Sequence, residues 1–173
     1  MNERERQILI VNGAGLLLGS IAVGWIFFFF LLKAMVLWPI PGNVPVDIPG
    51  DERGWRMAHM EGLTQGLLLI GIGAIGGHLR LSPRQSRVLL WSSIVTGWLF
   101  FLPSAFGPMV GVRGLAFGGG PFGGDVTLNN LMYVFGWPPM IAVHVMLPLL
   151  FWGALQRLRA MPAARTMSEM RET

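Results

Sequence analysis

The sequence contains no cysteine among its 173 residues. Disulfide bonds, thiolate metal sites and covalent haem attachment through a C-x-x-C-H motif are therefore excluded. Charged residues are also scarce: Asp, Glu, Lys and Arg make up 13% of the chain, about half the share found in a soluble domain. No acidic residue lies between Glu61 and Asp125, and 53% of all residues are hydrophobic. A soluble fold of this size could not bury so much apolar surface.

Four long apolar stretches are present, at about residues 8–32, 55–79, 88–110 and 128–155. Each is long enough for a helix that crosses the hydrocarbon core, which takes about 20 residues. The sequence therefore predicts an all-α integral membrane protein, a single domain over residues 1–173 that places a bundle of four transmembrane helices in the lipid bilayer. The first stretch is too long for the apolar part of a signal peptide, so we expect it to be a retained anchor.

Arginine and lysine are unevenly distributed between the two sides of such a bundle. One side has nine: Arg4, Arg6, Arg80, Arg84, Arg87, Arg157, Arg159, Arg165 and Arg171. The other side has four: Lys33, Arg53, Arg56 and Arg113. Because cytoplasmic segments are enriched in these residues, both termini are predicted to be cytoplasmic, in a multi-pass protein of the cell inner membrane. The net charge of +4 and the pI near 11 come from basic residues that lie beside the apolar stretches and have a topological role. Nucleic acid is therefore not an expected partner.

His59 lies near the outer start of the second apolar stretch, within GWRMAHMEGLTQG. Burying an ionisable side chain in a membrane is costly, so it indicates a functional site. On a helix, Gly66 falls within about 20° of His59 and Gly62 about 60° away. This glycine face could accept a porphyrin plane, with the imidazole as axial ligand. Alternatively, Gly62 and Gly66 form a small-xxx-small pair for helix packing, with a hydrogen-bonded histidine beside it.

Other polar residues lie within the predicted membrane helices. Glu61 and Gln65 are four residues apart and share a different helix face, where they either line a polar pocket or bond to each other. His144 lies near the middle of the fourth stretch. Its depth in the membrane differs from that of His59 by roughly 10 Å or more, which argues against both histidines ligating one haem.

Three arginines, Arg53, Arg56 and Arg113, share the outer side of the bundle with His59. Guanidinium groups bind carboxylates well, so these side chains could hold the propionates of a haem. Alternatively, they pair with the acidic residues of the same region, which are Asp47, Asp51, Glu52 and Asp125.

Two segments of the chain resemble styrene oxide isomerases. The segment PGDERGWRMAHMEGLTQG (residues 49–66) is similar to the entry to the second helix of that family, and RGLAFGGGPFGGD (residues 113–125) is similar to its third loop. Length, number of spans and loop pattern match over nearly the whole chain.

The resemblance implies a fold, a cofactor and a reaction. The family forms homotrimers of four-helix subunits with ferric haem b near the subunit interfaces. Its iron ligand is the histidine of a W-x-x-A-H pattern, which is His59 here. The iron is a Lewis acid for the oxygen of a small apolar epoxide. Ring opening then gives a benzylic cation, and a hydride shift gives an aldehyde.

Three positions depart from the family pattern. Gln65 stands where the family has Asn, Thr96 replaces an Asp before Gly97-Trp98, and Ser104 replaces a Tyr. A Tyr hydroxyl can stabilise developing charge at a point that the shorter Ser cannot reach. The haem ligand is thus retained while the catalytic polar groups at 65, 96 and 104 differ, which argues against styrene oxide itself as the substrate. Two further hypotheses remain: a haem protein of the same fold that binds a gas or transfers electrons, and a haem-free membrane protein.

Overall fold

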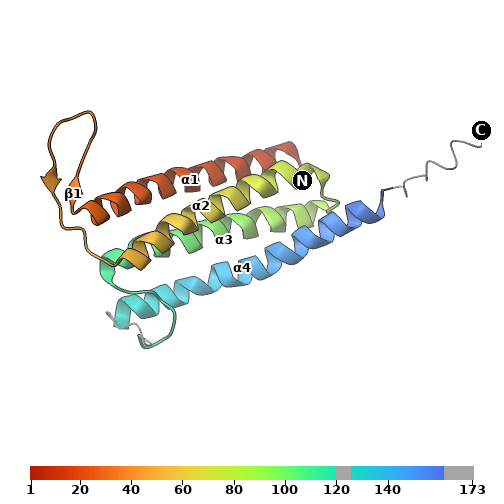
Figure 1. The fold of residues 1–173 in the computed structure, drawn as a ribbon. Helices are drawn as coiled ribbons and strands as arrows, with labels where there is room; N and C mark the ends of the chain where they lie inside the picture. Colours follow the sequence, from red (N-terminus) through yellow and green to blue (C-terminus); the bar gives the residue numbers. More distant parts are fainter. Residues whose placement is uncertain (120–125, 162–173) are drawn as a thin grey trace, which may run out of the picture.

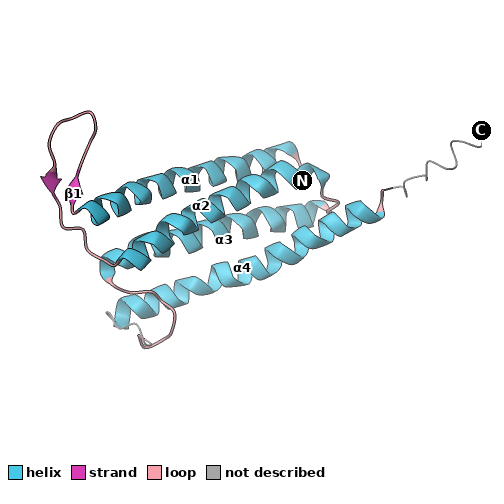
Figure 2. Ribbon diagram, in the orientation of Figure 1, coloured by secondary structure: helices cyan, strands magenta, loops and turns pink. Residues whose placement is uncertain are grey.

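The structure, a computed structural model, describes residues 1–119 and 126–161. Four long helices run side by side over most of their length (Figure 1): α1 Glu3–Leu32, α2 Glu52–Ile75, α3 Pro83–Val110 and α4 Val126–Arg159. A short 3₁₀ helix, η1 (Gly76–His78), continues α2. The strands β1 (Ala34–Met35) and β2 (Val44–Pro45) pair antiparallel in the loop between α1 and α2 (Figure 2).

All four helices are long and apolar enough to cross a membrane. Large apolar side chains such as Leu18, Leu67 and Phe151 are exposed on the outside of the bundle, as expected where helices face lipid. The prediction of an all-α chain with four helices long and apolar enough to be membrane spans is therefore confirmed. The orientation of the termini across the membrane stays a prediction.

Three helices begin three to five residues before their apolar stretches because polar residues cap them. Asn2 and Glu5 form a capping box at the start of α1, and Ser82 and Gln85 form another at α3. Asp51 caps α2 by accepting a hydrogen bond from the backbone of Gly54. Each cap satisfies amide groups that a helix start leaves unpaired. The predicted starts are therefore too late, although the end of α1 at residue 32 and the end of α3 at residue 110 are confirmed.

The core of the bundle joins apolar side chains from all four helices. It includes Leu16 of α1, Trp55 and Leu69 of α2, Phe101 of α3 and Met146 of α4. The helix pairs α1–α2, α2–α3 and α3–α4 make the main contacts. Helices that follow one another in the sequence are therefore neighbours in space, and α2 packs against both α1 and α3.

Candidate functional site

His59 lies on the face of α2 that contacts α1, and its side chain is half-buried. Its Nδ1 is 2.9 Å from the backbone oxygen of Ser20. A carbonyl can only accept, so Nδ1 carries the proton and donates it, and Nε2 keeps its lone pair. The Ser20 hydroxyl donates to the backbone oxygen of His59 at 2.7 Å. Within the part of the chain that the structure describes, Nε2 has no hydrogen-bond partner.

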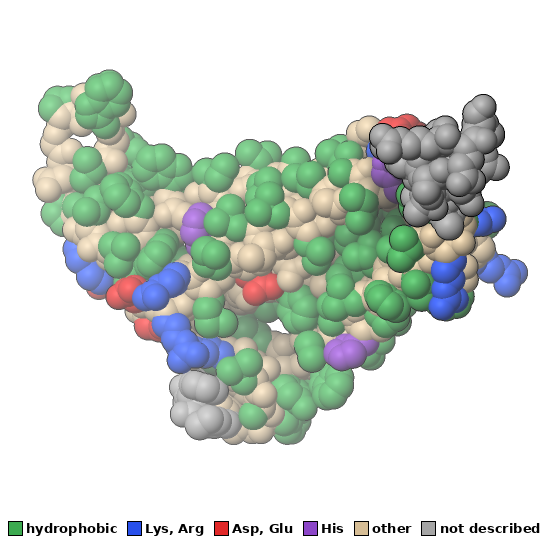
Figure 3. Space-filling model, turned by 45° about the vertical axis from the view of Figure 1, so that its right-hand side comes forward, with side chains coloured by type: hydrophobic (Ala, Val, Ile, Leu, Met, Phe, Trp, Pro, Cys, Tyr) green, Lys and Arg blue, Asp and Glu red, His purple; other side chains and the backbone are tan. Residues whose placement is uncertain are grey.

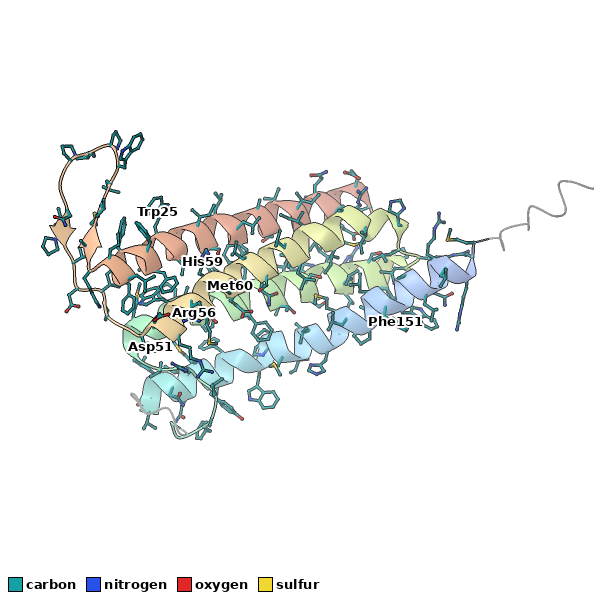
Figure 4. All side chains as sticks on the ribbon, in the orientation of Figure 1. Trp25, Asp51, Arg56, His59, Met60 and Phe151 are labelled. Atoms are coloured by element: carbon teal, nitrogen blue, oxygen red, sulfur yellow. The ribbon has the colours of Figure 1, made fainter. Side chains whose placement is uncertain are left out.

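Gly24, one turn after Ser20 on α1, makes room for the imidazole. A Cβ atom at Gly24 would lie 2.9 Å from both Cε1 and Nδ1 of His59, closer than a side chain tolerates. Figure 4 shows His59 in the space between the α1 and α2 ribbons. Ser20 and Gly24 thus fix the ring from one side, and neither was identified from the sequence. Their spacing, a small residue followed by another four positions later, is the one signal in the sequence that could have indicated them.

The glycine face of α2 is filled by the protein itself. A Cβ at Gly62 would lie 2.7 Å from both the Phe101 ring and Ser20, and a Cβ at Gly66 would lie 2.8 Å from Leu17. Of the two alternatives that the sequence left open for Gly62 and Gly66, the structure shows helix packing. This face has no space for a porphyrin plane, because α1 and Phe101 occupy it.

Of the three arginines Arg53, Arg56 and Arg113, the last two form ion pairs. Arg56 pairs with Glu52 one turn earlier on α2, and Arg113 Nη2 lies 3.1 Å from Asp51 Oδ2. Pairing with nearby carboxylates, the alternative to a propionate site, is thus confirmed for these two. Asp125 lies outside the described residues.

The Asp51 carboxyl is held in its ionised form at the outer end of α2. Its pKa is lowered from the usual 3.8, chiefly by the hydrogen bond from the Gly54 backbone; partial burial opposes this shift, and Arg113 adds to it. The same carboxyl therefore caps α2 and fixes the segment that carries Arg113.

A cavity of about 570 Å³ lies between α2, α3, α4 and the start of the segment that joins α3 to α4. Its walls are largely apolar and include Met57, Phe100 and Trp137. Its polar lining residues are Asp51, Arg53, Glu61, Ser104, Arg113 and Tyr133. Tyr133 is the single tyrosine of the chain.

The joining segment is fastened over the outer end of the cavity by α4. Asn129, which is buried, accepts a hydrogen bond from the Gly114 backbone at 3.0 Å and donates to the Ala116 oxygen at 2.7 Å. Asn130 accepts a further one from the Gly118 backbone. These bonds hold Arg113 and Leu115 in the cavity lining.

Gln65 and Thr96 are not among the residues that line the cavity. Gln65 Nε2 donates to Glu61 Oε1 at 2.8 Å, so Gln65 acts on the cavity through Glu61. Gln65 Oε1 and Thr96 Oγ1 are buried and have no hydrogen-bond partner among the described residues. Of the three positions that match polar groups of the family, Ser104 lines the cavity directly.

The cavity and His59 lie on opposite sides of α2. The lining residues Met57 and Glu61 stand two positions before and after His59, which places them about 160–200° around the helix. The body of α2 therefore separates the imidazole from the cavity of the same chain. His144 is exposed on α4, with Nδ1 bonded to the oxygen of Met140, a cavity-lining residue of the same helix.

Comparison with known proteins identifies the family. A family model described as styrene oxide isomerase matches residues 5–155. The styrene-oxide isomerase of Pseudomonas fluorescens is 32% identical over 114 residues, which cover 61% of this chain and 66% of that protein. The aligned segment thus spans just under two thirds of that relative's length. The family match takes in all four helices together with His59 and the cavity, and on this basis the chain belongs to the styrene oxide isomerase family.

Proposed function

We propose that this protein is a multi-pass inner-membrane isomerase that binds ferric haem b through His59 and converts an apolar epoxide to a carbonyl compound. The observation that carries the proposal is the state of the His59 ring. Nδ1 is held by the Ser20 carbonyl while Nε2 keeps a free lone pair. This arrangement, with the second ring nitrogen bonded to a carbonyl, is the one that metal-ligating histidines use.

The donor set fits haem b better than a bare metal ion. Three or more His, Cys, Asp or Glu side chains that could share an ion do not occur together in residues 1–119 and 126–161. A single histidine is sufficient for haem, because the porphyrin supplies four nitrogen ligands. Arg53, at the end of α2 where His59 lies, is the candidate for a propionate, because Arg56 and Arg113 are paired with Glu52 and Asp51.

Bound there, ferric haem would supply a Lewis acid for an epoxide oxygen. The residues of the chain would do the rest. The apolar walls formed by Met57, Phe100 and Trp137 would bind the hydrocarbon part and exclude water that could add to a reactive carbon. Ser104 would offer a hydroxyl to the substrate oxygen, from a position closer to the helix backbone than a tyrosine hydroxyl would reach.

A homotrimer would complete this site. Within one protomer, α2 separates His59 from the cavity. A subunit interface could instead bring the imidazole of one protomer next to the cavity of its neighbour. Substrate would then bind between protomers. We further infer that both termini are cytoplasmic, because the basic residues are concentrated at their end of the bundle.

A non-enzymatic haem protein, for gas binding or electron transfer, is the alternative. It is favoured by the unpaired Thr96 hydroxyl and by Ser104, which stand where the family has Asp and Tyr. Product analysis with a panel of aryl and alkyl epoxides separates the two functions: carbonyl products support the isomerase, and their absence from a fully haem-loaded protein supports the alternative.

The proposal is tested by replacing His59 with Ala and recording the absorption spectrum of the purified protein. Loss of haem from His59→Ala with an unchanged helix content is the expected result, since the apolar spans are untouched. His144→Ala is the matched control and should keep its haem, because His144 is bonded within its own helix. Normal haem in His59→Ala would contradict the proposal. So would a bis-histidine spectrum lost in both variants, because no coordination position would remain open for a substrate.

A further inference from the structure

Glu61 is an acidic residue inside the membrane-spanning part of α2. The other acidic residues of the described chain lie at helix starts or in the outer loop: Glu3, Glu5, Asp47, Asp51 and Glu52. Glu61 follows the first residue of α2 by nine positions, which places it about 14 Å along the helix. A carboxyl group at such a depth is costly to maintain, so its retention calls for a specific role.

Glu61 is not part of a structural ion pair. The salt bridges of residues 1–119 and 126–161 join other residues, and the bond that Glu61 makes is to the Gln65 amide, at 2.8 Å. A neutral amide orients the carboxylate without neutralising its charge. The side chain is half-buried and lines the cavity. Figure 3 shows a hollow in the molecular surface with an acidic side chain beside it and apolar side chains around it.

The surroundings of Glu61 strengthen its electrostatic effect. Met57 lies one turn before it on α2, and Phe100 and Trp137 are further apolar lining residues. A charge in such surroundings acts more strongly on a neighbouring group than it would in water. At the end of the cavity near the start of α2, Asp51 offsets the charge of Arg113, and Arg53 is the other basic lining residue. Asp51 and Glu61 are ten residues apart on one helix, about 15 Å along its axis, so Glu61 is the acidic group of the inner wall.

The isomerisation of an epoxide creates positive charge on carbon. The C–O bond breaks and the oxygen keeps its electron pair, which leaves the carbon cationic. Hydrogen then migrates with its electron pair from the oxygen-bearing carbon, and an oxygen lone pair closes the C=O bond. The rearrangement is intramolecular and needs no oxidant, reductant or other co-reactant. A fixed negative charge beside the carbon would stabilise the transition state more than the uncharged substrate, which is the requirement for catalysis.

We propose that Glu61 is a catalytic residue whose carboxylate, oriented by Gln65, stabilises the cationic carbon of an epoxide bound in the cavity between α2, α3 and α4. The substrate class is then an epoxide with an apolar group that can share positive charge, such as an aryl ring. This inference rests on the proposed isomerase function, and it assigns the cavity to the hydrocarbon part of the substrate.

The test compares wild-type holoprotein with Glu61→Gln, which has the same shape and no charge. Benzyltrimethylammonium is the probe for the cation, because it cannot ligate iron, and neopentylbenzene is its neutral isostere. Binding is followed by tryptophan fluorescence, for which Trp137 in the cavity wall is the reporter and Trp137→Phe the check. The ratio of the two affinities, compared between variants, cancels partitioning into detergent. We expect the preference for the cation to fall at least about tenfold in Glu61→Gln.

The same variants are assayed for isomerisation of para-substituted styrene oxides. Glu61→Gln should lower kcat by about 100-fold, as the loss of one electrostatic contact to a transition state does, with a smaller change in KM. The rate should also become more sensitive to electron-donating substituents, because the ring must then carry more of the charge. Glu61→Asp keeps the charge and should retain the cation preference, which covers the case in which Glu61→Gln folds poorly. Glu52→Gln, at the exposed start of α2, is the matched control.

The outcomes separate this inference from the proposed function. An unchanged cation preference in Glu61→Gln overturns the inference, whether activity is kept or lost, since lost activity alone would indicate a packing role. An active wild type with an equally active Glu61→Gln overturns it as well, while leaving the isomerase function in place. A wild type that turns over neither these compounds nor the wider panel of aryl and alkyl epoxides contradicts the proposed function itself, and the cation preference is still measurable in that protein.

Discussion

The position of the His59 ring is set by two small residues of the neighbouring helix. The backbone oxygen of Ser20 accepts a hydrogen bond from Nδ1. Gly24 has no side chain in the space that the ring occupies. A side chain at residue 24 would push the imidazole away from α1. Because an axial ligand must be oriented as well as present, these residues are positioning residues for any haem on His59.

Gly24→Ala should therefore lower the haem content without lowering helix stability. The new methyl group would lie 2.9 Å from Cε1 and Nδ1, so the ring has to shift. Alanine is favoured over glycine in a helix by about 1 kcal/mol, so the helix itself should not be weakened. The measurement is haem absorbance per protein together with the ferric electron paramagnetic resonance spectrum. A several-fold loss of haem, or a clear change in the spectrum, is expected.

Gly71→Ala is the matched control, since a Cβ at Gly71 meets nothing within 4 Å. It should behave as the wild type in both measurements. If Gly24→Ala and Gly71→Ala give the same haem content and the same spectrum, the fit of the ring against α1 does not control the cofactor.

His59 could be identified from the sequence, but its surroundings could not. A histidine in an apolar stretch next to glycines is visible in the sequence alone. Its partners Ser20 and Gly24 depend on how α1 is rotated and shifted against α2, and a sequence pattern does not contain that register. For the same reason Gly62 and Gly66 were interpretable in two ways, and only the position of Phe101 and α1 identified their packing role. The other face of α2 was predicted in part, since Glu61 both lines the cavity and bonds to Gln65, the two alternatives given for that pair.

At the scale of elements, the apolar pattern predicted the helices well and their starts poorly. An apolar stretch marks the part of a helix that lies in hydrocarbon, whereas a helix begins where its first amides are capped. The S-x-x-Q pattern at Ser82 and Gln85 is a readable cap, and Asp51 before α2 is another. The hairpin of β1 and β2 was not predicted, because strands of two residues have no detectable alternation.

Asp51 links two elements, so its substitutions should separate its two roles. Asp51→Ala removes both the cap of α2 and the pair with Arg113, and should destabilise the protein by about 1 kcal/mol. Asp51→Asn keeps a capping oxygen and removes the charge. Its effect should be smaller, because an exposed ion pair contributes less than about 1 kcal/mol. Thermal unfolding in detergent, followed by circular dichroism, measures both.

The pH dependence of this contribution has a defined sign. The pKa of Asp51 is lowered in the folded protein, so its contribution is fully present above the ordinary value of 3.8 and is lost as the pH falls below it. The difference in melting temperature between wild type and Asp51→Asn should therefore shrink below about pH 4. A difference that stays constant from pH 7 to pH 3 would show that the charge of Asp51 has no part in stability.

At the scale of the whole molecule, charge is concentrated at the two ends of the bundle. Figure 3 shows basic side chains at both ends and apolar side chains over the body between them. The N-terminal amino group contacts the Gly76 oxygen, and Arg6 donates to the Gly73 oxygen. The start of α1 therefore lies at the same end as η1, and α4 finishes there as well (Figure 1).

This end carries the larger share of the positive charge. Its described basic residues are Arg4, Arg6, Arg80, Arg84, Arg87, Arg157 and Arg159, and those of the opposite end are Lys33, Arg53, Arg56 and Arg113. Arg165 and Arg171 lie outside the described residues. The opposite end also holds Asp47, Asp51 and Glu52. The asymmetry favours a cytoplasmic location for the end that holds the termini, because positively charged segments are retained there during insertion.

Reporter fusions test this orientation. Alkaline phosphatase, which is active only in the periplasm, should be silent when fused after Thr173 and active when inserted at Gly42. Gly42 lies in the exposed outer loop, with nothing within 4 Å of its Cβ position, so an insertion there leaves the bundle intact. Green fluorescent protein, which does not mature after export in unfolded form, should give the reverse pattern. Phosphatase activity at residue 173 would invert the orientation and place the start of α2, with His59, nearer the cytoplasmic side. The same experiment therefore decides toward which side of the membrane the proposed site lies.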